Sequence, residues 1–323
     1  MSRRSRSTPA PQRSSTSPRR EAGARRAVAA SPPPAPGRRS AKPARRGTAA
    51  PFPTTLAALD ELAAAGAKVA VRIVDLDRGS VILAGDDSTT LPIAGLGVVP
   101  LLIEVATEFE RGTLHPYEII DRTTLEPVET GGVWQHLKAP ALPLIDLAVL
   151  AAATGDAIAT NALIDRVGLP AVRARIESMG LSRSALLDRF RDHRGPDDAP
   201  HFALGSAEEL ASMFAALVNS EAISAGVSAQ VAEWLSLNHD LSLVASATGL
   251  DPFAHENDDH GLLFINKTGR DDGVRVEAGV LAGPRAGVAY ALIVCFDDLS
   301  IMHRLRAHGV FRALGVELME YVY

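Results

Sequence analysis

The sequence predicts an α+β fold with a five-stranded antiparallel sheet, flanked by terminal helices and carrying an inserted all-helical subdomain. Three observations lead to this prediction. A helix and two strands open the folded part, and three strands and a helix close it. Between them, residues 98–220 carry mostly helical patterns. Because short turns join neighbouring strands at each end, we expect antiparallel pairing.

A basic tail precedes this fold. Residues 1–50 contain thirteen Arg or Lys, one acid and no aromatic residue, so they carry +12, while the remaining 20 basic and 37 acidic residues give −17. Such a segment buries too little apolar surface to fold, so we predict a disordered tail over 1–52. The folded domain is predicted over 53–323, with an α/β part in 53–97 and 221–323 and a helical part in 98–220.

The tail leaves two interpretations open. Its charge suits weak contact with nucleic acid or an anionic surface, but without aromatic residues to stack on bases it also fits a solvated extension or a stretch that is not translated. No run of about 18 apolar residues suits a membrane, and no apolar core follows the basic start as in a signal peptide. We therefore expect a cytoplasmic protein with no membrane partner; the oligomeric state is not indicated.

The first elements have clear local signals. A helix is expected over 54–65, capped by Thr54 or Thr55 and closed by Gly66. Residues 68–76 alternate as a strand, with Val69, Val71 and Ile73 on one face, and a second strand follows at 80–85.

The middle of the chain is predicted to be helical. A helix spans Val98–Arg111 and ends at Gly112. Ser206 followed by Glu209 has the pattern of a capping box. Further helices are expected at 144–153, 157–168, 170–179, 207–220 and 227–237, with a polar loop at 189–201.

The last elements are three strands and a helix. The strands are expected at 261–269, 274–283 and 287–296, and the helix at 302–319. Cys295, the single cysteine, excludes a disulfide framework and a multi-cysteine metal site, and we expect a buried, inert thiol.

Lys267-Thr268-Gly269 ends one of these apolar strands, and Arg275 lies on the next. With the order of elements, this motif resembles the class A β-lactamase and penicillin-recognising serine hydrolase family over residues 54–323, which implies a β-lactamase-like fold. In that family, K-T-G lines one wall of the active site and holds the substrate carboxylate. The resemblance therefore implies that Lys267, Thr268, Gly269 and Arg275 bind a small-molecule carboxylate.

The break between two central helices carries a second motif, which the family writes S-D-N. Aligning Asn161 with the family's T-A-x-N places Gly155 on the Ser, Asp156 on the Asp and Ala157 on the Asn. The family's Ser relays a proton and its Asn holds the substrate amide, so both functional groups are missing here. Asp156, whose role is mainly to hold the loop, is retained, and the resemblance places it among the binding residues of the site.

The family's S-x-x-K motif falls on LPIAGLGVVP, residues 91–100. Aligning Val99-Pro100 places Gly95 on the nucleophilic Ser and Val98 on the Lys. The reaction needs a hydroxyl beside the oxyanion hole and an amine to take its proton. Glycine and valine supply neither group.

The loop that carries the deacylating glutamate in β-lactamases also departs from the family. Residues 187–201 contain no glutamate and no E-x-x-L-N, but they hold four aspartates, of which Asp192 lies roughly where relatives keep an acid. Exposed charges on such a loop are more often solvated than catalytic. The four are Asp188, Asp192, Asp197 and Asp198.

These replacements predict a catalytically degenerate protein that is retained for ligand binding or regulation. Losing the nucleophile or the base of a serine hydrolase lowers the rate by on the order of a million-fold. The alternative is an active hydrolase of amide or ester bonds with relocated groups, such as Thr154, His136, Asp156 or the loop aspartates. Thr154 also fits a helix-end cap, and His136 an exposed loop position.

We expect no metal or other cofactor. The nine histidines are scattered without HExxH or paired ligand spacing, and GLG at 95–97 lacks the lysine of a phosphate-binding loop.

Overall fold

The computed structural model describes residues 51–129, 131–255, 261–297 and 300–323. The predicted disordered tail lies outside these residues, except at its last two positions. Phe52 is buried, and its ring stacks on Tyr321 at a centroid distance of 6.2 Å. Phe52 therefore belongs to the folded part and not to the tail.

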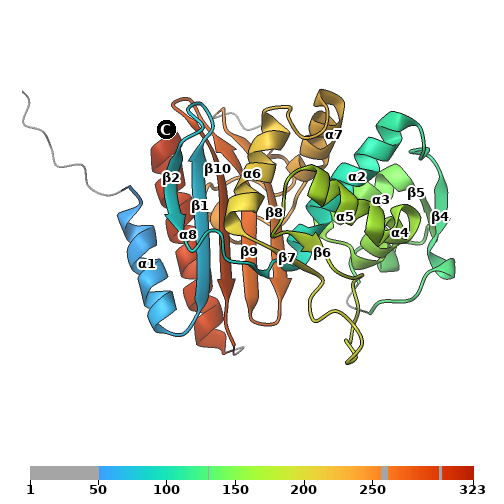
Figure 1. The fold of residues 1–323 in the computed structure, drawn as a ribbon, viewed down its shortest axis with the longest axis horizontal. Helices are drawn as coiled ribbons and strands as arrows, with labels where there is room; N and C mark the ends of the chain where they lie inside the picture. The colour runs from blue at the N-terminus through green and yellow to red at the C-terminus, as the bar shows by residue number, and fades with distance from the viewer. Residues whose placement is uncertain (1–50, 130, 256–260, 298–299) are drawn as a thin grey trace, which may run out of the picture. The chain divides into compact units, whose positions relative to one another are not determined.

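A five-stranded antiparallel sheet forms the centre of the fold, which confirms the predicted class (Figure 1). Its order, β2-β1-β10-β9-β8, places the N-terminal strands beside the C-terminal ones. The two ends of the chain meet where β1 pairs with β10, from Lys68 opposite Cys295 to Asp75 opposite Val288. The strands are β1 (Lys68–Asp75), β2 (Val81–Gly85), β8 (Leu263–Asp271), β9 (Val274–Ala282) and β10 (Gly287–Cys295).

Alternation along the strands gives the sheet two buried faces. Val71 and Ile73 of β1 pack in the cluster under α1 (Pro53–Ala64) and α8 (Ile301–Val322), as their predicted common face requires. Ala70 packs on the opposite side, in the cluster shared with the other helices. The sheet therefore joins two apolar cores.

The start of α1 is stabilised differently from the prediction. Neither threonine caps the helix: Phe52 is the N-cap residue, in a left-handed conformation and without a side-chain cap. Instead, the Glu317 carboxylate on α8 accepts hydrogen bonds from Thr54 N at 2.8 Å, Thr55 N at 2.9 Å and Thr55 Oγ1 at 2.6 Å. A residue near the C-terminus thus satisfies the free N–H groups of the first helix.

The helical part comprises α2 (Val98–Arg111), α3 (Leu144–Thr154), α4 (Ala157–Val167), α5 (Leu169–Ser178), α6 (Ala207–Val218) and α7 (Ala225–Ser236). The helices α6 and α7, on either side of residue 220, have different partners. Helix α6 lies against β1, β9 and β10, whereas α7 packs on α2, α3 and β8 (Figure 1). The reason is that α6 covers the apolar face of the sheet opposite α8.

Ser206 caps α6 as predicted, by accepting a hydrogen bond from Glu209 N. The reciprocal half of the capping box is not formed. The Glu209 carboxylate instead accepts from Arg183 N at 2.9 Å and Ser184 Oγ at 2.7 Å, so it ties α6 to the preceding segment.

Short elements escaped the sequence analysis because two or three residues carry no measurable periodicity. Two small antiparallel sheets contain them, in the orders β3-β7-β6 and β4-β5. These strands are β3 (Leu91–Pro92), β4 (Ile119–Asp121), β5 (Ala141–Pro143), β6 (Ala185–Leu186) and β7 (Ala203–Gly205). Among the described residues, no helix is long and apolar enough to cross a bilayer.

Replacing Glu317 by Ala is expected to lower the free energy of unfolding by about 1–2 kcal/mol, the usual effect of losing a helix cap. Burial opposes ionisation of Glu317, but the hydrogen bonds from Thr55 and Thr54 outweigh it and hold the pKa below its usual value of 4.5. The stabilisation is therefore present above pH 4.5 and is lost as the pH falls through the folded-state pKa.

Chemical denaturation at pH 7 and at pH 3 measures this effect, with the exposed Glu320→Ala on the same helix as control. Equal losses for both variants at pH 7, or a Glu317→Ala loss that is undiminished at pH 3, would contradict the proposed cap.

Candidate functional site

A cleft of about 470 Å³ lies between the start of α2, the break between α3 and α4, the loop that follows β6, and strand β8. These segments are distant in the sequence, and the sheet brings them together. Its walls are formed by Ala94, Gly95, Val98, Thr154, Gly155, Ala157, Phe190, Arg191, Asp192, Arg194, Phe202, Asn238, Asp240, Lys267, Thr268, Arg270, Asp271 and Asp272.

Lys267 supplies a buried cation to this cleft. Its Nζ donates a hydrogen bond to Ala152 O at 2.8 Å, at the C-terminal end of α3, where the helix dipole favours positive charge. Burial lowers the pKa of Lys267 to about 8, and the charge of Asp240 opposes the shift. The amine is therefore largely protonated at pH 7.

Thr268 and Arg270 both direct their donors toward one carboxylate, Asp240. Thr268 Oγ1 donates to Asp240 Oδ2 at 2.7 Å, and Arg270 Nη2 donates to Oδ1 at 2.9 Å. Burial opposes ionisation of Asp240, but hydrogen bonds from Thr268 and Ser242 and the charge of Arg270 outweigh it, so its pKa lies below the usual value. The chain itself thus places an ionised carboxylate on the wall.

Sequence reasoning missed Asp240. It lies in the loop after α7, and no motif or periodicity marks it there. Its role follows only from its hydrogen bonds with Thr268 and Arg270 of β8.

A buried polar network lies behind the β8 wall. Asn238 Nδ2 donates to Asn266 Oδ1, and Asn266 Nδ2 donates to Glu277 Oε1, both at 2.8 Å. Tyr290 OH and Val244 N also donate to the Glu277 carboxylate, each at 2.7 Å. Because Asn238 lines the cleft, this network fixes the wall from the core outward.

Burial raises the pKa of Glu277 to about 7, although its hydrogen-bond donors oppose the shift. Between pH 4.5 and about 7, the folded protein therefore keeps a proton on Glu277 that the unfolded chain has already released. The stabilisation due to this proton is complete below pH 4.5 and is lost as the pH rises through about 7.

Glu277→Gln, which cannot ionise, is expected to remove this pH dependence. The difference in unfolding free energy between wild type and Glu277→Gln should fall steadily from pH 4.5 to pH 7, as measured by urea denaturation. Parallel pH profiles for the two proteins would show that Glu277 titrates normally.

The two positions aligned with S-x-x-K are closely packed. A Cβ placed on Gly95 would lie 3.3 Å from the Thr268 carbonyl oxygen, and one on Gly269 would lie 2.5 Å from the Ile93 carbonyl oxygen. The short helical turn that holds Gly95 therefore approaches β8 as closely as glycine allows.

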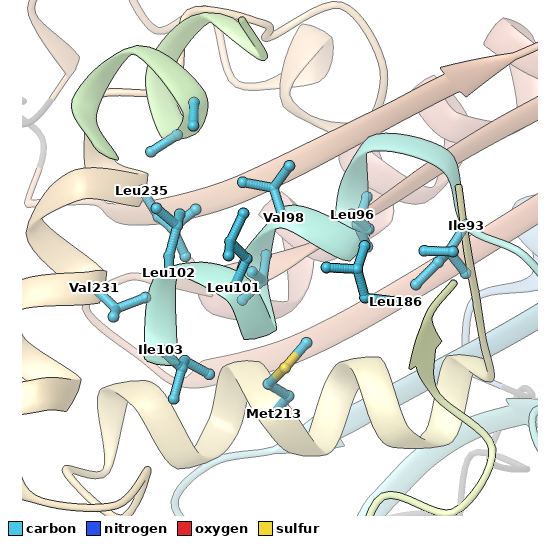
Figure 2. Packing of buried hydrophobic residues seen from close by; sticks show 14 of the residues in the cluster. Ile93, Leu96, Val98, Leu101, Leu102, Ile103, Leu186, Met213, Val231 and Leu235 are labelled. Atoms are coloured by element: carbon cyan, nitrogen blue, oxygen red, sulfur yellow. The ribbon is translucent and has the colours of Figure 1, made fainter. Parts of the chain in front are cut away.

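Val98, aligned with the family's lysine, is fully buried. It belongs to the apolar cluster around the start of α2, with Leu96, Leu101 and Leu102 (Figure 2). Burying such a side chain contributes about 1.5–3 kcal/mol. Val98 is thus an integral part of the core.

The break between α3 and α4 has a similar character. Gly155 ends α3 in a left-handed conformation with φ of 66°, which favours glycine over residues that carry a side chain. Ala157 begins α4 and lines the cleft with a methyl group. A serine at position 155 would have to adopt this left-handed conformation, and position 157 supplies a methyl group to the cleft where the family has an amide.

Asp156 does not face the cleft. It is completely buried, and its carboxylate accepts hydrogen bonds from Ala159 N at 2.9 Å and Trp134 N at 2.7 Å. It therefore caps α4 and anchors the loop around Trp134. These contacts fit the loop-holding role that the resemblance implied, but they do not fit the expected place of Asp156 among the binding residues, because the carboxylate is buried away from the cleft.

Asp156→Ala leaves two buried N–H groups without acceptors, so we expect the unfolding free energy to fall by about 2–4 kcal/mol. For a domain of this size, this corresponds to a Tm lower by roughly 5–10 °C, which calorimetry measures. The exposed Asp197→Ala is the matched control. A Tm within 2 °C of wild type, by the same order of estimate, would exclude this anchoring role.

Arg275, predicted to bind with Lys267 and Thr268, does not line the cleft. Its Nη1 donates to the backbone carbonyls of Asp271 and Val274. Arg270, its direct partner across the β8–β9 ladder, lines the cleft instead. The position of the strands decides between the two, because β8 is the edge strand that borders the cleft and β9 lies one strand further from it.

The loop aspartates mostly hold the loop. Asp188 forms ion pairs with Arg191 and Arg194, and Asp198 pairs with Arg191. Asp192 lines the cleft, and its Oδ2 accepts a hydrogen bond from Glu129 N at 2.8 Å.

The other relocated candidates are placed as follows. Thr154 lines the cleft, but its hydroxyl donates to Leu150 O within its own helix at 2.8 Å. His136 is exposed and is not among the cleft residues.

Cys295 is half-buried, less than predicted, and burial raises its pKa to about 11. The thiol is therefore protonated at neutral pH. Among the described residues, no three His, Cys, Asp or Glu side chains come together as a metal site.

Comparison with known proteins agrees with this geometry. Residues 53–322 match the sequence model described as the Beta-lactamase enzyme family. No curated protein sequence matches the chain significantly.

Three solved structures share the fold. A β-lactamase from Sphaerobacter thermophilus DSM 20745 is 22% identical, with a TM-score of 0.70 over 83% of this chain and 96% of that one. PBP-A is 18% identical, with a TM-score of 0.68 over 83% and 94%. A β-lactamase from Xanthomonas campestris pv. campestris is 16% identical, with a TM-score of 0.68 over 84% and 98%.

Proposed function

This chain belongs to the beta-lactamase enzyme family, and we propose that it is a catalytically degenerate member whose cleft binds a ligand without hydrolysing it. The observation that carries the proposal is the packing at the two positions aligned with the nucleophile and its base. Gly95 lies against the β8 backbone, and Val98 is fully buried in the core. This packing supports the proposal, because neither position carries a hydroxyl or an amine and both are in close contact with their surroundings.

The groups that remain in the cleft are poorly suited to nucleophilic attack. Among the described residues that line it, Thr154 and Thr268 supply the hydroxyls, and no Ser, Cys, Tyr or His is present. Thr154 donates within its helix, and Thr268 donates to Asp240. Because the pKa of Asp240 is lowered, its carboxylate is a weak base for a hydroxyl proton at neutral pH.

The cleft nevertheless retains groups that suit ligand binding. Lys267 is cationic and held in place by Ala152 O, and Thr268 and Arg270 offer further donors on the same wall. Burial on a sheet pre-organises these groups, which lowers the entropic cost of binding. We propose that the ligand is a small molecule that contacts this wall through a carboxylate, as the family resemblance implies.

An active hydrolase with relocated groups has less support. His136 is not among the cleft residues, Asp156 is buried as a helix cap, and the Asp188 carboxylate is engaged by two arginines. These contacts give Asp156 and Asp188 structural roles away from a reacting bond.

The proposal predicts neither turnover nor acylation. After incubation of the purified protein with benzylpenicillin, intact mass spectrometry should show no covalent adduct, and a chromogenic cephalosporin should remain unhydrolysed above the buffer rate. An adduct or turnover would overturn the proposal, and peptide mapping would then identify the nucleophile.

A Gly95→Ser, Val98→Lys double variant distinguishes the two functions further. If relocated groups performed catalysis, installing the family pair would change the rate little. A large gain of β-lactam hydrolysis in the double variant would count against relocated groups.

A further inference from the structure

We propose that Asp240 is an internal carboxylate that occupies the anion-binding position of the β8 wall and competes with the carboxylate of any ligand. This inference rests on the proposed ligand-binding function and adds a specificity-determining residue to it. The observation behind it is that two donors of the wall are already directed at a carboxylate of the chain itself.

The contacts of Asp240 imitate those of a bound carboxylate. Oδ2 accepts from the Thr268 hydroxyl, and Oδ1 accepts from the Arg270 guanidinium and from Ser242 N at 3.2 Å. Lys267 lies close enough to feel the charge of Asp240. Both oxygens are therefore satisfied by groups that would otherwise be free to bind an anion.

Asp240 is positioned to meet a ligand. It lines the cleft, and its side chain retains 30% of its surface exposed to solvent. A ligand carboxylate approaching Thr268 would meet an ionised carboxylate at hydrogen-bond distance from the same hydroxyl. Like charges at such a distance repel, and an introduced repulsive group is one of the ways in which proteins discriminate against a ligand.

Two further carboxylates of the cleft add to this effect, whereas the Lys267 amine opposes it. Asp271 and Asp272 also line the cleft, next to Arg270. Arg191 and Arg194, the cations on the opposite side, are paired with Asp188. A carboxylate ligand therefore binds only where its other contacts compensate for displacing Asp240.

A purely structural role for Asp240 makes a different prediction. Its carboxylate also closes a turn by accepting from Ser242 N, so removing it could loosen the loop without opening a site. Asp240→Asn keeps an acceptor for Ser242 N and removes the charge, whereas Asp240→Ala removes both. The two variants together separate charge competition from loop stability.

The test is isothermal titration calorimetry of the full chain with benzylpenicillin, which carries a carboxylate, and with its neutral methyl ester. We expect Asp240→Ala and Asp240→Asn to bind benzylpenicillin at least tenfold more tightly than wild type. The methyl ester should bind all three proteins with the same Kd within about twofold, since a factor of two is well under 1 kcal/mol. In Asp240→Ala, adding Thr268→Val should abolish the gain, because the released hydroxyl is the group that the ligand uses.

The inference is overturned if Asp240→Asn remains folded, with a Tm near that of wild type, and yet binds benzylpenicillin no more tightly. It is also overturned if the methyl ester gains affinity equally, because a loosened loop would then explain the change. Failure of the proposed function looks different, since it appears as an acyl adduct or hydrolysed ligand in the wild-type protein.

Discussion

The antiparallel pairing of β1 with β10 is the contact on which the rest of the structure depends. It joins residues 68–75 to residues 288–295 and so closes the sheet across more than two hundred intervening residues. The helices α1 and α8 then lie on the same face, where Glu317 can serve the first turn of α1. The same closure holds β8 at the sheet edge, facing the start of α2.

The cleft combines a rigid wall with charges that the chain balances internally. Asn238, Asn266 and Glu277 support β8 from the core, and Lys267 is held at the end of α3. Unpaired charges in such a site are costly, so a carboxylate beside Thr268 and Arg270 stabilises the wall when no ligand is present. The Asp240 contacts that satisfy the empty wall are the same contacts that a ligand carboxylate would have to replace.

The positions that the resemblance aligns with the family's motifs have structural roles in this chain. Asp156 holds Trp134 and α4 with hydrogen bonds that involve no substrate. Gly95 and Val98 supply close backbone approach and apolar packing, both of which stabilise the fold without contributing chemistry.

Local patterns in the sequence determined most elements of the fold. The helix Val98–Arg111 with its end at Gly112, the strand that carries Lys267, and the Ser206 cap all follow from periodicity and capping, which act over a few residues. The absence of a serine at position 95 is likewise evident without coordinates.

The tertiary structure alone decided how distant residues meet. It brings the Asp240 carboxylate within hydrogen-bond distance of Thr268 and provides Glu317 in place of the expected threonine cap. It also places Arg270, and not Arg275, at the cleft. The first two depend on contacts between segments that are far apart in the sequence, and the third depends on which strand of the sheet borders the cleft. Local sequence patterns do not encode these contacts, because the contacts form only when the five strands assemble into one sheet.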